Sequence, residues 1–404
     1  MMRKIMILAM LLLAAPAQAA QFEFSGYADL RAVAPATAED SWLDGGLGKL
    51  RYGSGDSDFQ FAGAVGQGTV LLTPDLLVSA VARAGTQQKL GVDLLEAYMR
   101  YRPVSVTEWR WSLQAGAFFA PFSLENTELG WAPYWTLTPS AINSWFGEEL
   151  RTVGGEFALE WRRETGTLKL TAALFGWNDP AGVIIADRGW ALDDLPTGLF
   201  EHLREPDATL ILHHDTPPDT TPIFVEYDNR PGWYAGASWT DAGQWMAEIF
   251  RYDNEADPAA HEEDYFAWRT KFWDAGISKE MGEFTLLAQG VSGNTEIAPF
   301  PGFTSITDFD SAYALLGWQR GDWRIAGRAE LLHTRTHNSF GASPATSENG
   351  SALTAAASWL PNDWLKLTGE LLWVSSKRGE RAIEGIDPEQ SETQLQLSAR
   401  VYLN

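Results

Sequence analysis

The stretch ASWLPNDWLKLTGELLW, residues 357–373, decides the fold. After its Leu-Pro-Asn-Asp corner, leucines and a glycine alternate with Lys366, Thr368 and Glu370. Alternation with a period of two is typical of a β-strand that has one apolar and one polar face. Tryptophans flank the corner on both sides, and indole rings favour the boundary between membrane and water. The stretch therefore predicts a hairpin whose leucines face lipid and whose charged side chains face a watery lumen.

The same alternation recurs along the chain, from residues 22–31 to residues 394–403. Short corners are predicted at 73–75, 103–108, 162–166, 240–244, 279–283, 319–322 and 361–363. Longer connections are predicted at 34–59, 87–90, 120–148, 178–231, 253–264, 293–310, 335–350 and 376–390. Taken in turn, these connections join sixteen strands. Short turns at one end and long loops at the other are typical of outer-membrane barrels.

We therefore predict an all-β fold, a transmembrane antiparallel β-barrel of about sixteen strands over residues 20–404. Its short turns would be periplasmic and its long loops extracellular. The 178–231 connection is too long for a plain loop, and ATLILHH and TPIFVEY within it resemble strands. This segment is either an extracellular or inward-folded insertion, or a pair of extra strands that makes eighteen.

Tryptophans near the predicted turns favour the barrel over a soluble β-sandwich, whose strands would also alternate. A sandwich would not explain tryptophans at successive turn ends. The predicted aromatic girdle consists of Trp109, Trp111, Trp161, Trp239, Trp245, Trp318, Trp323, Trp359 and Trp364.

The first nineteen residues have the pattern of a secretory signal peptide. Arg3 and Lys4 precede an apolar run and an Ala-Gln-Ala cleavage site that ends at Ala19. No later stretch approaches the ~18 apolar residues of a membrane-spanning helix. Export by a signal peptide, together with the predicted barrel, points to the outer membrane of a Gram-negative bacterium.

The amino-acid composition limits the kinds of partner and chemistry that we expect of this protein. The net charge of −23 excludes nucleic acid, whose binding needs a basic face. The chain has no cysteine, and we expect no metal site and no cofactor, although acidic extracellular loops leave room for divalent cations. The six histidines fall in loops or near strand ends, and no G-x-S-x-G motif occurs. We expect no catalytic residues and no enzyme.

Charged residues of the lumen and of the 118–149 loop predict the pore. Alternation also directs Arg324, Lys366 and Arg400 into the lumen. If the loop folds inward, its carboxylates face a basic wall and produce a transverse field. The candidate constriction residues are Glu125, Glu128, Glu148 and Glu149 on the loop, and Arg31, Arg83, Arg100 and Arg110 on the wall.

Four aromatic residues, Trp131, Tyr134, Trp135 and Trp145, crowd the same loop. They either line a sugar-binding track or fix the loop to the wall. We favour fixation, because an inward loop needs apolar contacts to hold its position.

Two segments carry a family resemblance. PFSLEN (121–126) with TPSAINSWFGEE (138–149), and GWNDPAGVIIADRGWALDD (176–194), resemble proteobacterial porins of the phosphate-selective (O and P type) superfamily. The resemblance implies a homotrimeric, water-filled barrel among outer-membrane lipid and lipopolysaccharide, with the third loop folded inward as a constriction. Members of that superfamily build their pore from Lys and Arg, whereas this chain is acidic.

The function expected from these observations is that of a porin, a diffusion channel for small hydrophilic solutes or ions. The acidic composition predicts a mild cation preference. The alternative is a substrate-specific channel that takes up sugar, organic acid, or phosphate and other anions.

Overall fold

Sixteen long strands form one antiparallel barrel in the computed structural model, which describes residues 21–56, 58–207, 220–343, 346–382 and 385–403. The predicted signal peptide lies outside these residues. In chain order the strands are β1 (Gln21–Ala36), β2 (Asp58–Thr73), β3 (Leu76–Ala84), β4 (Val92–Tyr101), β5 (Trp109–Phe118), β6 (Thr152–Arg163), β7 (Gly166–Gly176), β10 (Gly232–Asp241), β11 (Trp245–Asp253), β14 (Arg269–Met281), β15 (Phe284–Ile297), β16 (Ser305–Arg320), β17 (Trp323–Asn338), β19 (Glu348–Asn362), β20 (Leu365–Arg378) and β21 (Glu389–Leu403).

The barrel closes where its first and last strands meet. β1 pairs with β21 from the Gly26–Leu403 pair to the Ala36–Thr393 pair, and each other long strand pairs with its neighbours along the chain. A seventeenth strand, β18 (Gly341–Ala342), pairs only with β17. Closure satisfies the backbone groups that an open sheet edge would leave unpaired, as a lipid environment requires.

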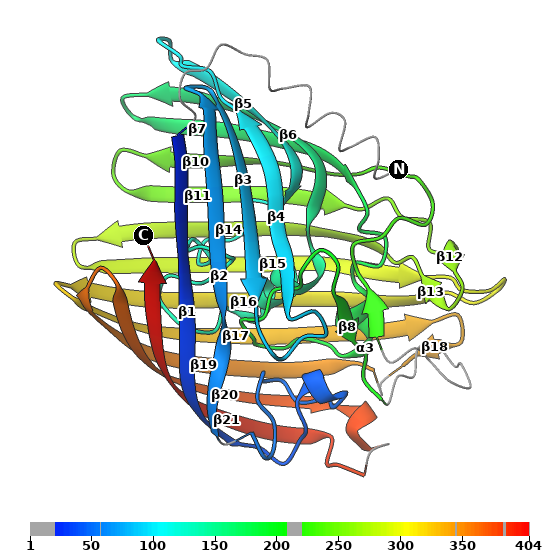
Figure 1. The fold of residues 1–404 in the computed structure, drawn as a ribbon. Helices are drawn as coiled ribbons and strands as arrows, with labels where there is room; N and C mark the ends of the chain where they lie inside the picture. Colours follow the sequence, from blue (N-terminus) through cyan, green and yellow to red (C-terminus); the bar gives the residue numbers. More distant parts are fainter. Residues whose placement is uncertain (1–20, 57, 208–219, 344–345, 383–384, 404) are drawn as a thin grey trace.

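Seven tight turns join the strands at one end of the barrel, and eight longer loops join them at the other. We call these the turn end and the loop end (Figure 1). All fifteen connections occur where they were predicted, and the sixteen-strand barrel is confirmed, although the strands extend further into several loops: the loop predicted at 293–310 is limited to 298–304, and the one predicted at 335–350 to 339–347. The eighteen-strand alternative is wrong, because β7 pairs directly with β10 from Gly166–Asp241 to Phe175–Gly232.

The segment between β7 and β10 contains α3 (Val183–Asp187) and a short pair outside the barrel, β8 (His202–Arg204) with β9 (Thr220–Pro222). TPIFVEY contributes to β9, whereas ATLILHH falls outside the described residues. The remaining elements are α2 (Ala141–Glu149), the 3-10 turns η1 (Trp42–Asp44) and η2 (Gly379–Ala382), and the pair β12 (His261–Glu262) with β13 (Tyr265–Phe266). Within the described part of the chain, no helix is both long and apolar enough to cross a membrane.

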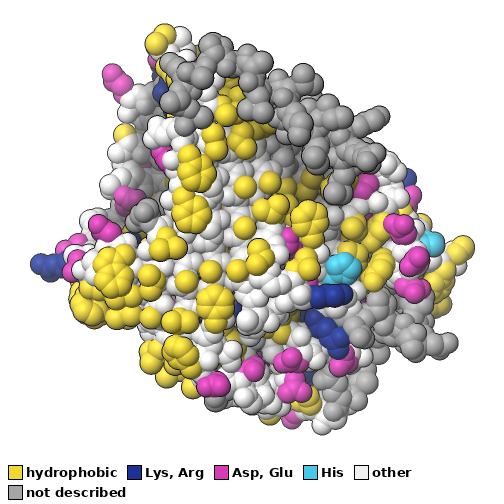
Figure 2. All heavy atoms as spheres, in the orientation of Figure 1, with side chains coloured by type: hydrophobic (Ala, Val, Ile, Leu, Met, Phe, Trp, Pro, Cys, Tyr) yellow, Lys and Arg dark blue, Asp and Glu magenta, His cyan; other side chains and the backbone are white. Residues whose placement is uncertain are grey.

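Side chains alternate between the two faces of the barrel wall, as strand geometry requires. Leu353 and Leu371 point outward with exposed fractions of 54% and 48%, whereas Lys366 and Glu370 point inward and are buried. Figure 2 shows hydrophobic side chains spread over the visible strands and charged side chains mainly toward the margins. The hairpin predicted at residues 357–373 therefore has the predicted orientation.

The nine predicted girdle tryptophans lie on strands close to the turn end or in its turns. Trp109 stacks on Trp161 across β5 and β6 at a centroid distance of 5.8 Å. Trp323 stacks likewise on Trp359 across β17 and β19 at 6.1 Å. In both pairs the two tryptophans are direct partners in the strand register at the turn end, so cross-strand pairing places their indoles side by side.

A charge placed halfway along the outer face should weaken the barrel in lipid. Leu353→Arg is expected to lower the free energy of unfolding by about 2–4 kcal/mol, the cost of an arginine near the middle of a bilayer. Phe340→Arg, in an 84% exposed residue of the loop end, is the control and should change it by less than about 0.5 kcal/mol. Urea unfolding in liposomes measures both. Equal stability of the two variants would mean that Leu353 does not face lipid.

Candidate functional site

The loop between β5 and β6, residues 119–151, folds into the barrel. Ser140 caps α2 by accepting a hydrogen bond from the backbone of Asn143, which starts the helix at this point. All nine residues of α2 are buried. The inward fold predicted for residues 118–149 is confirmed.

Arg328 of β17 anchors this loop. Its guanidinium donates to Glu125 at 3.1 Å and to Glu330 at 2.7 Å. It also donates to the backbone oxygens of Thr138 and Pro139, each at 2.9 Å. Neither Arg328 nor the two carboxylates is exposed to solvent. A buried charge needs such complete pairing, so the arrangement fixes the loop in one position.

The loop after β7 also enters the barrel. Arg188, just after α3, forms two parallel hydrogen bonds with Glu148 at 2.9 and 2.6 Å. Ser144 of α2 exchanges hydrogen bonds with the backbone of Asp193. The sequence allowed residues 178–231 to be either an extracellular or an inward-folded insertion. The structure places the first part of this segment inside the barrel, against residues 119–151.

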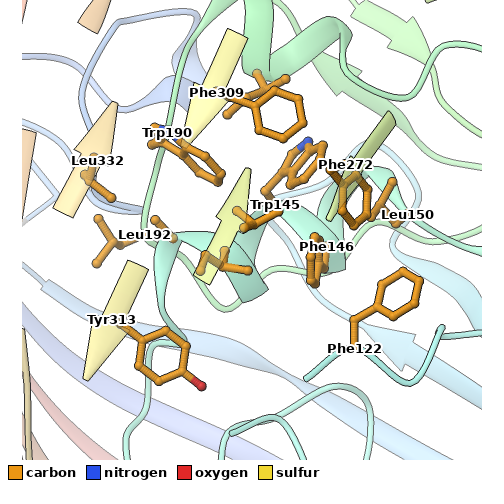
Figure 3. Packing of buried hydrophobic residues seen from close by; sticks show 14 of the residues in the cluster. Phe122, Trp145, Phe146, Leu150, Trp190, Leu192, Phe272, Phe309, Tyr313 and Leu332 are labelled. Carbon is orange, nitrogen blue, oxygen red and sulfur yellow. The ribbon is translucent and has the colours of Figure 1, made fainter. Parts of the chain in front are cut away.

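Aromatic side chains fill one side of the interior (Figure 3). Trp145 and Phe146 of α2 point toward Phe272 and Phe309 of the wall, with centroid distances of 4.9 Å for Trp145–Phe309 and 5.5 Å for Phe146–Phe272. Trp190 of the second loop joins them, 5.8 Å from Trp145. The cluster is buried and close-packed, so this side of the lumen is a core.

Fixation accounts for the four loop aromatics better than a sugar-binding track does. Trp145 and Trp135 are buried. The indole of Trp131 donates to the backbone oxygen of Asn143 at 2.7 Å. The ring of Tyr134 lies 3.7 Å from the guanidinium carbon of Arg324. Each contact joins the loop to itself or to the wall.

Space remains beside the inserted loops, and part of it borders the wall formed by β1, β2, β3 and β21. A narrow cavity of about 40 Å³ lies between this wall and both inserted loops. A wider turn-end cavity of about 820 Å³ opens beside the turns. Tyr27 lines both cavities. Together they are the candidate passage, and the narrow cavity, with room for only a few water molecules, is the smaller of the two.

Charged groups face one another across the narrow cavity. Its lining includes Arg31, Arg83 and Arg400, and also Asp29 and Asp194. Arg83 donates to the backbone oxygen of Pro196 at 3.1 Å. The cavity is therefore polar, although it lies beside an aromatic core.

Asp194 comes from the second inserted loop and binds the wall from the opposite side. It contacts Arg31 at 2.5 Å and Arg51 at 2.8 Å. Burial opposes its ionisation, but these two arginines lower the pKa of Asp194 to about 2. Asp194 is thus a permanent anion that ties this loop to the arginine side of the passage.

At the turn end, Glu128 lies among three cations. Its carboxylate is 3.3 Å from Arg324, 3.7 Å from Lys366 and 3.7 Å from Arg400. The Tyr402 hydroxyl donates to the same carboxylate at 3.4 Å. Glu128 lines the turn-end cavity, so this polar cluster borders the wider part of the passage.

The structure separates the predicted constriction residues into three groups. Arg31, Arg83 and Glu128 line the passage. Glu125, Glu148 and Glu149 are buried in the contacts between loops and wall. Arg100 and Arg110 lie toward the turn end and line neither cavity; Arg110 pairs with Glu160. A role of all eight in conduction stays a prediction.

Sequence reasoning missed Arg51 and Asp194. Both lie on loops, where no alternation reports direction. Arg324, Lys366 and Arg400 were directed into the lumen by alternation, but their convergence on one loop carboxylate could not be read from spacing. The only signal for Asp194 was its position at the end of the second family-like segment.

Glu149, the last residue of α2, should make stability depend on pH. Burial raises the pKa of its carboxyl to about 7, although it accepts hydrogen bonds from Trp145 and from the backbone of Ile184. The folded protein therefore holds this proton more tightly than the unfolded chain, whose Glu149 has an ordinary pKa of 4.5. The free energy of unfolding should fall as pH rises from that value to about 7.

The variant Glu149→Gln should make this pH dependence shallower, by up to about 1.4 kcal/mol per pH unit. Chemical unfolding at several pH values across this range measures it. Glu164→Gln, in the exposed turn between β6 and β7, is the matched control and should leave the slope unchanged. An unchanged slope in Glu149→Gln would show that the carboxyl titrates normally.

These features define a class of protein. A closed sixteen-strand antiparallel barrel, apolar outside and polar within, with a loop folded into its lumen, is a porin-type β-barrel. Solved structures share this fold over nearly the whole chain. The outer membrane channel DcaP of Acinetobacter baumannii matches with a TM-score of 0.54 and 11% identity, covering 96% of this chain and 99% of that one.

Two further solved structures share this fold. OmpF of Salmonella typhi, in complex with daunomycin, matches with a TM-score of 0.54 and 9% identity over 95% of this chain and 98% of that one. An anion-selective porin from Comamonas acidovorans matches with a TM-score of 0.51 and 12% identity over 95% and 100%. At such identities the similarity concerns the fold. No protein-family model matches the chain, and neither does any curated protein.

Proposed function

We propose that this protein is an outer-membrane channel for small hydrophilic solutes. One observation carries the proposal: a closed barrel with an apolar outer face encloses two polar cavities that share Tyr27 and whose lining extends from Tyr402 at the turn end to Arg83 near the loop end. A soluble protein would not expose so many large apolar side chains around its circumference. In this orientation the turns are periplasmic, and the girdle tryptophans contact the membrane interface.

The narrowness of the passage favours the second candidate, a substrate-specific channel. Two loops occupy the lumen, and the cavity between them and the β1 wall has a volume of only about 40 Å³. A general diffusion pore would keep a wider open section. The mild cation preference predicted from composition applies to the acidic loops at the mouth, whereas in the narrow cavity three arginines accompany two aspartates.

The partners that we propose are outer-membrane lipid, lipopolysaccharide and two further copies of this chain. Small residues of neighbouring strands align in the register of the outer face, where Gly26 pairs with Gly66 and Gly66 with Ala82. Such a flat face permits close packing of subunits. Membership of the O and P type superfamily remains a proposal that the inward position of residues 118–149 supports.

Planar-bilayer recording tests the function. Purified protein should give discrete channels of low conductance, and a transported solute should reduce the ion current in a saturable way. Ohmic channels of high conductance, without block by any solute, would favour the general porin. Complete absence of channels from heat-modifiable, correctly folded protein would contradict both. Gel migration before and after boiling reports the folded barrel and, in the unheated sample, the trimer.

A further inference from the structure

The carboxylate of Glu128 lies where three cationic side chains converge, and these side chains could equally bind the carboxylate of a solute. Lys366 and Arg400 are almost completely buried, with side-chain exposed fractions of 3% and 4%, yet each is 3.7 Å from the Glu128 carboxylate. Arg324 is nearer, at 3.3 Å. Close charge-assisted hydrogen bonds measure about 2.7–2.9 Å. Three cations thus converge on one carboxylate without holding it tightly.

Each of the three cations has a further partner besides Glu128. Arg400 donates to Asp29 at 3.0 Å and covers the ring of Tyr27 at 4.2 Å. Both partners are on β1, so the wall holds Arg400 independently of Glu128. Arg324 covers the ring of Tyr134, and the ammonium of Lys366, on β20, reaches the backbone oxygen of Tyr134 at 3.5 Å. Tyr134 belongs to the inserted loop, so Arg324 and Lys366 contact the same loop that carries Glu128.

Glu128 belongs to a short turn of the inserted loop. Its backbone pairs with Ala132 in an isolated bridge, and the intervening Gly130 and Trp131 have φ angles of 70° and 67°. The tip of this turn, at Gly130, lines the narrow cavity, whereas Glu128 and Leu129 line the turn-end cavity. The turn therefore separates the two parts of the passage.

We propose that Arg324, Lys366, Arg400 and Tyr402 form a subsite for solutes that carry a carboxylate, and that Glu128 occupies this subsite until such a solute displaces it. Arg324 and Tyr402 line the turn-end cavity, which at about 820 Å³ has the size of a small-molecule site, whereas Arg400 lines the narrow cavity and Lys366 lies behind Glu128 and lines neither. Asp322 and Asp363 also line the turn-end cavity, from the turns. The proposal rests on the proposed channel function and names its substrate class.

Calorimetric titration of the purified protein in detergent with succinate tests the subsite directly. Glu128→Gln removes the competing charge and should tighten succinate binding by at least about tenfold. The double variant Glu128→Gln/Lys366→Met should lose that gain. Glu164→Gln makes the same change of charge in a distant turn and should bind as the wild type does. Uncharged succinamide should not bind.

Three results would overturn the proposal: no tightening in Glu128→Gln, equal binding by the double variant, or equal binding of succinamide. Phosphate binding as tightly as succinate would overturn the carboxylate assignment. If Glu128→Gln fails to fold, the wild type is compared with Lys366→Met instead. Lys366→Met should bind succinate at least about fivefold more weakly than the wild type. Because titration needs no current, a channel without succinate binding refutes only the subsite, and binding without a channel refutes only the proposed function.

Discussion

Replacing Arg328 by alanine is expected to lower the free energy of unfolding by about 3–5 kcal/mol, as when one partner of a buried ion pair is removed. The arginine holds Glu125 and Glu330 in a site without solvent contact. Its loss leaves two carboxylates close together without a cation. The backbone oxygens of Thr138 and Pro139 lose their donor as well. The loop before α2 should therefore leave the wall of β17.

Detachment of this loop should also be visible in single-channel recordings, as a larger and noisier conductance. Arg320→Ala is the matched control, because Arg320 is in the same barrel wall but has a side-chain exposed fraction of 73%. It should change stability by less than about 0.5 kcal/mol. A triple variant with leucine at positions 125, 328 and 330 should recover most of the lost stability, because apolar side chains replace the whole buried group. A loss below about 1 kcal/mol in Arg328→Ala would mean that this network does not hold the loop.

Replacing Trp145 by alanine should have the second large effect, a loss of about 3–5 kcal/mol of unfolding free energy. The indole is buried and contacts four other rings, among them Phe309 at 4.9 Å and Phe272 at 5.5 Å. Its removal leaves a cavity in the middle of the inserted loops. Water can enter this space from the passage, and we expect conductance to rise.

Two further variants help to explain the effect of Trp145→Ala. Trp145→Phe keeps an aromatic ring but removes the donor to Glu149, so it should cost less, about 1–2 kcal/mol. Phe300→Ala removes a ring that is 57% exposed in a loop and should leave both stability and conductance unchanged. If Trp145→Ala kept the wild-type conductance and stability, the aromatic cluster would not be what narrows the lumen.

The alternation of apolar and polar residues predicted the barrel correctly, because it reflects a local property of each strand. Lys366, Thr368 and Glu370 point inward in the structure, as their spacing predicted. Strand side chains have a period of two whatever the neighbouring strands contribute. The turns at Pro74 and Asp363 were equally readable, since proline and aspartate favour turns for local reasons.

Alternation could not predict where the side chains of the loops point. Glu125, Glu148 and Glu149 were grouped with Glu128 because all four share one loop, yet only Glu128 borders a cavity. The direction of a loop side chain depends on which distant partner it meets. Glu148 meets Arg188, forty residues further along the chain. No spacing within either segment encodes that contact.

The sequence by itself determined the barrel, its two ends and the faces of its strands, because these follow from alternation and turn chemistry within short segments. The tertiary structure alone decided between sixteen and eighteen strands, through the pairing of β7 with β10, and placed two loops in the lumen. It also brought Arg324, Lys366 and Arg400 to one carboxylate. Those features depend on contacts between residues far apart in the chain, which form only once the barrel has closed around them.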